Sequence, residues 1–422
     1  MIRKLLMRNY MLRTLFTLKG NGRVCLWAEP LWGIPYNLYM PYVSLYMAAM
    51  GLSAAQIGLV TSINIISQVV FSMFSGVVTD KLGRRWTTVI FDTLAWSVPT
   101  FIWMLSQNFA WFAAAAVFNG AWRVTETSWD LLLVEDMRDE EIMAALSLAQ
   151  VLGLLAAFIA PLSKFAVDAF GLVPTMRVLY GVTCTSMTIK FLIVHLYSSE
   201  TRMGRRRMQE TKEKRIFTLL WECKDVYLGQ VLSKRMLLTF GILAAYTLVT
   251  TLCSAYWALL VCRELHVGES SVALYSTVKS LVTLLCAMLL LHRISRANIR
   301  RPILQGVGLY CASLALLLLA RPGALLVPVL VVSCAMEAVA VAILSPTTRS
   351  LLLVNAKPEE RARVCGLIYA TIALLTAVFP GLVGMLAEVS LRLPFAVCIA
   401  LCLLCGVMTD RLSRLPPPQH GI

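Results

Sequence analysis

The chain is dominated by long apolar runs separated by short polar breaks, and this pattern continues along the whole sequence. Runs of roughly 18–27 residues are long enough to cross a bilayer as helices, which satisfy their own backbone hydrogen bonds. We therefore predict an all-α membrane protein with twelve transmembrane helices. The predicted spans lie near residues 24–49, 55–79, 86–106, 110–134, 142–169, 173–197, 236–262, 268–291, 302–320, 323–354, 361–387 and 391–410.

Composition supports the same class. Hydrophobic residues make up 59% of the 422 residues, charged residues only 14%, and the mean hydropathy is +0.74. A soluble domain carries about a quarter charged residues, so a soluble globular fold is excluded, and the apolar content excludes intrinsic disorder. The single Cys-x-x-Cys pair, Cys402 and Cys405, lies inside an apolar run. Free buried thiols are therefore favoured over a metal or redox site.

The net charge of +15 is explained by the position of the basic residues. Of the 38 Lys and Arg residues, 29 fall in the tails and loops of one side, and only Arg263, Arg321 and Arg392 fall in loops of the other. Positive loops stay in the cytoplasm, so both termini are predicted to be cytoplasmic. No nucleic-acid partner is needed to explain the charge. We expect a multi-pass protein of the plasma membrane, and specifically of a prokaryotic cell membrane.

The predicted spans divide into two halves. Residues 198–235 are polar and charged and lie close to the chain midpoint, which indicates a cytoplasmic linker. We favour a solvated charge run with no binding role for it. The predicted organisation is a tail (1–23), a six-helix bundle (24–197), the linker (198–235), a second six-helix bundle (236–410) and a tail (411–422). A weak repeat, Leu-Leu-Leu-Val at 131–134 and 351–354, is what two parallel repeats would produce.

The loop between the second and third spans has a distinctive composition, reading Gly76-Val-Val-Thr-Asp80-Lys-Leu-Gly83-Arg84-Arg85. A glycine at position 76 permits close approach of another helix, and Gly83 permits a tight turn. Asp80 stands at the membrane boundary beside three cations with which it can pair. A simple positive anchor would need neither the glycines nor the aspartate.

This loop resembles the signature of the major facilitator superfamily, Gly-x-x-x-Asp-Arg/Lys-x-Gly-Arg-Arg/Lys, which lies between helices 2 and 3 of that family. The resemblance implies two six-helix bundles that rock about a central cavity, with the substrate bound near the middle of the membrane. It also implies that the loop latches the cytoplasmic side in the outward-open state. By this resemblance the gating residues are Gly76, Asp80, Gly83, Arg84 and Arg85.

The fourth span carries a polar stripe. Asn119, Arg123, Glu126 and Asp130 are spaced four, three and four residues apart, so we expect them on one helical face. A charge near the bilayer centre costs about 2.5–3.5 kcal/mol, so this face should point to the bundle interior or to water. Arg123 can pair with Glu126 at i, i+3. The stripe is either a substrate and proton pathway or a static ion-pair network.

Further candidates are single polar or aromatic residues within spans. Lys190 and Lys279 are expected to pair with acids such as Asp92 or to reach the membrane surface. Lys164 stands at a position where drug–proton antiporters of the resembled family carry glycine. The remaining candidates for the substrate and proton pathway are Glu29, Tyr36, Tyr246, Trp257 and Glu337.

The function that these observations favour is secondary active transport of a small organic solute. Transport would proceed by alternating access and would be coupled to protons or another ion. The chain lacks a phosphate-binding loop and an HExxH pattern, so no enzyme activity, catalytic residue, metal or cofactor is expected. Export and uptake both stay open. The alternatives are a multidrug efflux pump and, from another class, a non-transporting receptor or scaffold. The expected partners are the solute, the coupling ion and lipid, and the expected state is a monomer.

Overall fold

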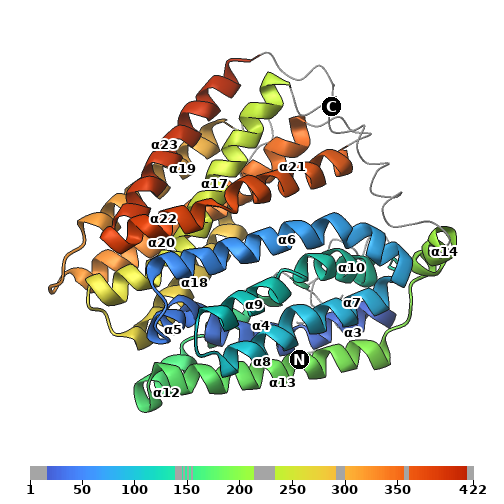
Figure 1. Ribbon diagram of the computed structural model, residues 1–422. Helices are drawn as coiled ribbons and strands as arrows, with labels where there is room; N and C mark the ends of the chain where they lie inside the picture. Colours follow the sequence, from blue (N-terminus) through green and yellow to red (C-terminus); the bar gives the residue numbers. More distant parts are fainter. Residues whose placement is uncertain are drawn as a thin grey trace, which may run out of the picture. The chain divides into compact units, whose positions relative to one another are not determined.

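The computed structural model describes residues 17–137, 155–212, 233–290, 300–355 and 361–415, together with residues 145, 148, 149, 152 and 153. Every regular element in these ranges is helical, as predicted (Figure 1). The described chain divides into two compact units. Unit 1 comprises residues 1–40 and 66–221, and unit 2 comprises residues 41–65 and 222–422. The division falls within one long helix, at Ile65–Ile66.

Unit 1 contains the first set of helices. They are α3 (Gly20–Ala28), α4 (Pro30–Tyr39), the second part of α6 (Ala54–Leu82), α7 (Arg84–Asp92), the π-helix η2 (Thr93–Ser97), α8 (Val98–Leu105), α9 (Phe109–Asn119), α10 (Trp122–Val134), η3 (Ala157–Ile159), α12 (Leu162–Phe170), α13 (Leu172–Tyr197) and α14 (Arg202–Thr211). Residues of α3, α10 and α13, including Cys25, Leu132 and Val194, form one buried apolar cluster.

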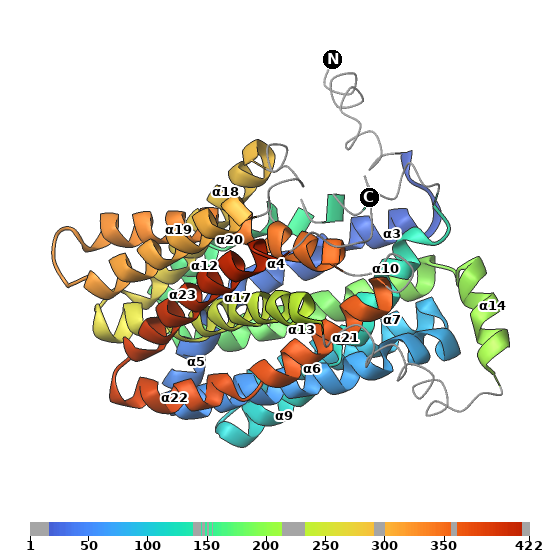
Figure 2. The same cartoon turned by 90° about the horizontal axis from the view of Figure 1, so that it is seen from above.

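Unit 2 contains the remaining helices. They are η1 (Met40–Tyr42), which begins at the boundary, α5 (Val43–Ala49), the first part of α6, α17 (Lys234–Leu259), η4 (Leu260–Glu264), η5 (Glu269–Ser271), α18 (Val272–Leu290), α19 (Arg300–Leu319), α20 (Leu326–Asn355), α21 (Arg361–Thr376), α22 (Phe379–Val389) and α23 (Leu393–Ser413). Helix α19 packs against both α20 and α23 (Figure 2).

Eight helical segments of the described chain are long and apolar enough to cross a membrane, and each coincides with a predicted span. They are Ala54–Leu82, Arg84–Leu105, Leu172–Tyr197, Lys234–Glu264, Arg300–Leu319, Leu326–Ser345, Ala370–Val389 and Leu393–Ser413. The predicted span 268–291 corresponds to α18. The predicted span 142–169 and the predicted linker 198–235 lie partly outside the described residues.

The predicted spans 24–49 and 110–134 are both interrupted. The run 24–49 is divided into α3, α4, η1 and α5, with Pro30 opening α4 and Pro41 inside η1, because proline lacks the N–H that a helix interior needs. The run 110–134 is divided at Gly120–Ala121 into α9 and α10. A side chain at Gly120 would stand 2.8 Å from the backbone nitrogen of Gln68, so glycine allows this turn to lie against α6.

Unit 2 contains a tight helix contact that also depends on glycine. A side-chain carbon at Gly384 of α22 would lie 2.7 Å from the Tyr256 hydroxyl and 2.9 Å from the Ala54 carbonyl oxygen. The Tyr256 hydroxyl donates to the Pro380 carbonyl oxygen at 2.8 Å, which leaves it little room to move. By contrast, a side-chain carbon at Gly308 of α19 would meet nothing within 4 Å.

We predict opposite effects of alanine at these two helical glycines. Gly384→Ala should destabilise the protein by about 1–3 kcal/mol through overpacking against backbone atoms, whereas Gly308→Ala should be neutral or stabilise it by up to about 1 kcal/mol through helix propensity. Melting followed by tryptophan fluorescence in detergent measures both. Equal melting temperatures for the two variants would contradict the packing described for α22.

Candidate functional site

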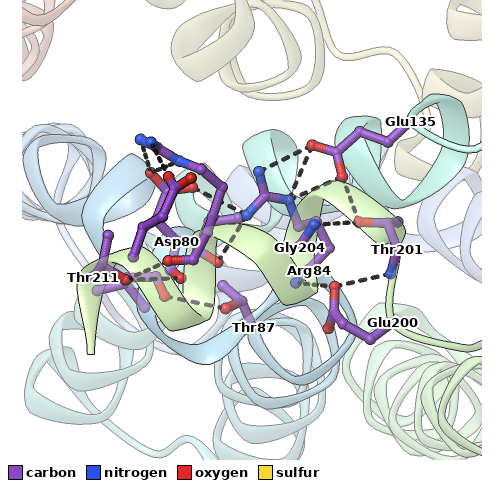
Figure 3. Close-up of polar contacts among 12 residues, drawn as sticks. Asp80, Arg84, Thr87, Glu135, Glu200, Thr201, Gly204 and Thr211 are labelled. Atoms are coloured by element: carbon purple, nitrogen blue, oxygen red, sulfur yellow. Dashed lines mark hydrogen bonds and ion pairs between the residues drawn. The ribbon is translucent and has the colours of Figure 1, made fainter.

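The turn between α6 and α7 is built on Gly83. Its φ of 82° lies in the left-handed region, which confirms that a tight turn is formed here. The exposed backbone N–H groups at the start of α7 are capped by a carboxylate from outside the helix. The nitrogens of Arg84 and Arg85 donate to Glu200 at 2.9 and 3.1 Å. An anionic group here stabilises the positive end of the helix (Figure 3).

The guanidinium of Arg84 is the buried charge of this site, with only 4% of the residue exposed. It lies between two carboxylates, 3.0 Å from Asp80 and 2.9 Å from Glu135 of the segment that follows α10 (Figure 3). Its Nε also donates to both oxygens of Glu135, at 3.0 and 3.1 Å. Removing one partner of such a buried pair would leave an uncompensated charge, so this network fixes α6, α7 and α10 to one another.

The polar segment after α13 contacts the same network. Arg207 of α14 binds Asp80 at 2.8 Å, and the Thr211 hydroxyl donates to the Asp80 carbonyl oxygen at 3.2 Å. The Thr201 hydroxyl donates to Glu135 at 2.5 Å and accepts from the Gly204 nitrogen, capping α14. The prediction that this stretch is a solvated run without a binding role is therefore wrong for residues 200–211. It was made from charge density, which does not reveal a specific partner.

Two charged residues of α14, Arg207 and Glu210, are held in their ionised forms by their partners. Hydrogen bonding to Asp80 raises the pKa of Arg207, and hydrogen bonding from Arg206 lowers the pKa of Glu210. Because the base gains and the acid loses proton affinity, both stay ionised at neutral pH. Loss of the Glu210 interactions is expected only as the pH falls towards the range in which carboxylates protonate.

The other two residues of the signature have different surroundings. Arg85 donates through Nε to the His195 carbonyl oxygen at 3.1 Å, which ties the start of α7 to the end of α13. A side-chain carbon at Gly76 would meet nothing within 4 Å in its own unit. The close helix approach expected at Gly76 is therefore not found among the described residues of unit 1.

The polar stripe of the fourth predicted span is divided by the break at Gly120–Ala121. Arg123 and Glu126 form the predicted i, i+3 pair at 2.7 Å, and both are partly exposed. Arg123 also donates to Gln68 at 3.1 Å, and its guanidinium lies 4.1 Å from the centre of the Trp122 ring. Asp130 is exposed on the same helix. Arg123, Glu126 and Asp130 therefore share one partly exposed face of α10.

Asn119 does not continue this face. It ends α9, and its amide donates to the Ala95 carbonyl oxygen in η2 at 2.9 Å. The prediction of one continuous stripe from Asn119 to Asp130 is wrong, because the turn at Gly120 changes the helical register before Arg123. The bond to Ala95 instead connects α9 to a π-turn, where the helix backbone carries an extra residue.

A second buried cluster lies inside unit 1. Lys190 of α13, only 4% exposed, forms an ion pair with Glu29 at 2.9 Å. Asp92 at the end of α7 is also buried and interacts electrostatically with Lys190. The rings of Trp32 and Trp129 stand 5.7 and 5.9 Å from the ammonium, and their ring N–H groups are buried without a partner among the described residues.

Aromatic rings extend this cluster along α4. Trp32 and Tyr36 stack at 4.9 Å, and Trp96 of η2 meets both rings edge-on, at 5.4 and 5.8 Å. Tyr39 continues the series by contacting Tyr36 at 5.7 Å. The candidates Glu29 and Tyr36 are therefore close together in one region of unit 1, as their helical spacing with Trp32 in the sequence indicates.

Unit 2 contains a similar pair, in which the acid is buried and the lysine is half-buried. Lys279 of α18 binds Glu337 of α20 at 2.6 Å, and the Tyr310 hydroxyl donates to the same carboxylate at 3.3 Å. The Lys279 ammonium lies 5.5 Å from the ring of Trp257, which in turn contacts Tyr275 at 5.6 Å. The candidates Trp257 and Glu337 thus both lie beside Lys279. The expectation that Lys279 pairs with an acid is confirmed.

Two other candidates lie apart from these clusters. Lys164 pairs with Asp168 at 2.5 Å on its own helix, α12, and both are substantially exposed. Tyr246 is half-buried on α17, where its carbonyl oxygen accepts from the Thr250 hydroxyl at 3.2 Å.

Several residues of the loop network were missed by sequence reasoning. Glu135, Glu200, Thr201 and Arg207 are far from Asp80 in the chain, and each belongs to an ordinary polar loop. Glu135 directly follows the apolar run at 131–134, and this acid at the end of a span was the one usable signal for a partner of the loop. The others had no signal in a single sequence.

We predict that α14 depends on the Arg207–Asp80 contact. Arg207→Gln should raise hydrogen exchange of the amides at 201–211 by about two- to fivefold, the worth of a partly exposed ion pair. Arg206→Gln is the matched control, since Arg206 binds only Glu210 among the described residues and is largely exposed. Hydrogen exchange measured by mass spectrometry on the full chain tests both variants. Equal increases in exchange for the two variants would contradict a stabilising contact between Arg207 and Asp80.

Comparisons with known proteins place this geometry in a family. A family model described as Major Facilitator Superfamily matches residues 32–323 and 238–422. The nucleoside transporter NupG aligns over 94% of this chain and 100% of its own, with a TM-score of 0.73 and 13% identity. A POT family transporter in complex with 5-aminolevulinic acid aligns over 93% and 96%, with a TM-score of 0.70 and 14% identity.

Similarity to curated sequences is limited to a short segment. The quinolone resistance protein NorA of Staphylococcus aureus is 28% identical over 84 residues, which cover 20% of this chain and 21% of that relative. The chain thus matches about a fifth of the length of this relative, whereas the fold matches solved transporters almost completely. The predicted fold class is confirmed, and the chain belongs to the major facilitator superfamily of secondary membrane transporters.

Proposed function

We propose that this transporter moves a small organic solute by alternating access and couples that movement to protons through the Glu29–Lys190–Asp92 cluster. The observation that carries the proposal is a charge imbalance. Two carboxyl groups, those of the buried Asp92 and of Glu29 with 13% of its side chain exposed, face one buried ammonium, that of Lys190. The cluster is therefore neutral only when one proton is bound.

Because the cluster is shielded from water, its excess negative charge is costly. An unpaired charge inside a membrane-spanning unit costs several kcal/mol, so the closed cluster favours uptake of a proton. Movement that admits water to the cluster lowers that cost and favours release of the proton. A proton that binds in one state and leaves in another is what coupling to an ion gradient requires, and one charge crossing 100 mV supplies about 2.3 kcal/mol.

The Lys279–Glu337 pair of unit 2 suits a different role. One ammonium and one carboxylate balance, and the Tyr310 hydroxyl already satisfies part of the acid. The flanking Trp257 and Tyr275 rings provide the flat apolar surface that organic solutes prefer. We assign recognition of a polar group of the solute to this pair, with Tyr246 of α17 as a further candidate.

The remaining candidates take supporting roles in this proposal. Arg123, Glu126 and Asp130 form a second, more exposed proton path on α10. Asn119, Tyr36 and Lys164 are retained as further candidates for the substrate and proton pathway. The loop network around Asp80 and Arg84 latches the cytoplasmic side. We retain the organisation into bundles 24–197 and 236–410, cytoplasmic termini, a prokaryotic plasma membrane and a monomer as parts of the same proposal.

Multidrug efflux is the alternative within transport. The similarity of one 84-residue segment to a quinolone resistance protein supports it. It predicts lower accumulation of several unrelated cationic drugs in cells that carry the protein. A non-transporting receptor or scaffold is the alternative from another class, and it predicts no flux of any solute in proteoliposomes.

Acid variants of the cluster separate proton coupling from solute binding and alternation. Glu29→Gln and Asp92→Asn should each abolish solute accumulation driven by a pH gradient in proteoliposomes while leaving exchange of internal for external solute intact. Exchange needs alternation but no net proton movement. The solute is one whose level differs, by untargeted mass spectrometry, between cells with and without the protein. Asp410→Asn, in an exposed pair with Arg300, is the control and should transport normally.

Persistence of gradient-driven accumulation in both acid variants would remove the cluster from the mechanism. If both acid variants instead lost solute exchange as well as accumulation, the cluster would have a structural role.

The second prediction concerns α10. Glu126→Gln should lower the rate of transport and flatten its pH dependence, because the variant keeps the shape of the side chain but carries no proton. Initial rates measured across a pH series in proteoliposomes test this. A pH profile that coincides with that of the wild type would exclude Glu126 from the pathway.

A further inference from the structure

A groove runs along the surface of unit 1 between α8 and α13, two helices that pack side by side (Figure 1). Its volume is about 770 Å³. Aliphatic side chains of both helices form most of its walls, and one cation, Arg177, stands among them. The lining residues are Met104, Leu105, Arg177, Val178, Gly181, Val182, Thr185, Ser186 and Ile189.

The walls of the groove face outwards from a membrane span. Val178, Val182 and Ile189 have 65%, 49% and 46% of their surfaces exposed, and they recur at helical spacing on α13. Gly181 leaves the floor open, since a side-chain carbon there would meet only the Met104 sulfur, at 3.2 Å. Apolar surface of this kind on a span is covered by hydrocarbon.

The polar groups in the walls are already satisfied, apart from Arg177. The Thr185 hydroxyl donates to the Gly181 carbonyl oxygen at 3.0 Å, and the Ser186 hydroxyl donates to the Leu31 carbonyl oxygen at 2.8 Å. Arg177 is exposed and makes no hydrogen bond or ion pair with any residue in the described ranges. Its five N–H donors thus require an acceptor from outside the chain or water.

The position of Arg177 along α13 matches the height of a lipid headgroup. The 26-residue helix is about 39 Å long, and a hydrocarbon core is about 30 Å thick, so each end extends about 4–5 Å beyond it. Arg177 lies five residues, or about 7.5 Å, from the start of the helix, within reach of the phosphate level by snorkelling. From Arg177 to Ile189 the groove runs about 18 Å, close to the depth of one leaflet.

We propose that this groove is a specific site for one anionic phospholipid, with an acyl chain between α8 and α13 and the phosphate on the Arg177 guanidinium. Charge complementarity and the match in depth identify the occupant. The groove opens at the end of unit 1 that is distant from the Asp80 loop, because α7 begins beside the end of α13 and α8 ends beside its start. The site is therefore separate from the loop network, while its inner end at Ile189 adjoins Lys190 along α13.

Spin-labelled phosphatidylglycerol and phosphatidylcholine in vesicles of defined composition test the proposal on the full-length protein. The wild type should hold phosphatidylglycerol about fivefold more strongly than phosphatidylcholine in the motionally restricted population, the effect of one cation on an anionic headgroup. Arg177→Gln should remove this preference. Arg321→Gln removes the same charge from an exposed loop of unit 2 and should leave the preference unchanged.

Val182→Trp fills the groove and should reduce restriction of both lipids, whereas Leu196→Trp, on an exposed part of α13 outside the groove, should not. Inorganic phosphate at millimolar concentration should not displace the lipid, because the acyl chain contributes to binding. A preference that survives Arg177→Gln, or equal effects of Arg177→Gln and Arg321→Gln, would overturn the proposal. So would displacement by phosphate, or unchanged restriction in Val182→Trp.

Discussion

The constraint that governs this structure is the cost of holding an ionised side chain away from water. Arg84 and Lys190 are buried, Lys279 is half-buried, and each is held by one or more carboxylates within 3.0 Å. The acids come from other helices or from distant loops, so each pair also fixes the packing of the elements that carry it. Removing one partner of a buried pair would leave the other charge unpaired inside the protein, at a cost of about 3–5 kcal/mol.

The three sites differ in how their charges balance, and the difference separates their proposed roles. Around Arg84, an extra cation from α14 meets the extra acid, so the network is suited to a rigid clasp between loop and helix ends. At Lys279 one acid meets one cation, which suits recognition of a polar solute. At Lys190 an acid is in excess, which suits a proton. The proton coupling proposed here depends on that third balance.

Much of the fold could be predicted from the sequence, because membrane spans are read from apolar length alone. The pairing of charges could not be. Glu29 and Lys190 are 161 residues apart, and no local pattern links them. The break at Gly120 was missed because a single glycine in an apolar run does not distinguish a helix from a turn. The role of α14 was missed because a basic stretch looks alike whether it is solvated or docked. The i, i+3 pair of Arg123 and Glu126 was predictable, since helical spacing alone determines it.

Infrared difference spectroscopy on the full-length protein in lipid tests the central claim most directly, because it detects the carbonyl stretch of a protonated carboxylic acid. Across a pH series, the wild type should show the band of one carboxyl group that gains and loses a proton, and Asp92→Asn or Glu29→Gln should remove or shift that band. A spectrum in which both variants retain the wild-type band, or in which the wild type has none, would contradict proton binding at the Lys190 cluster.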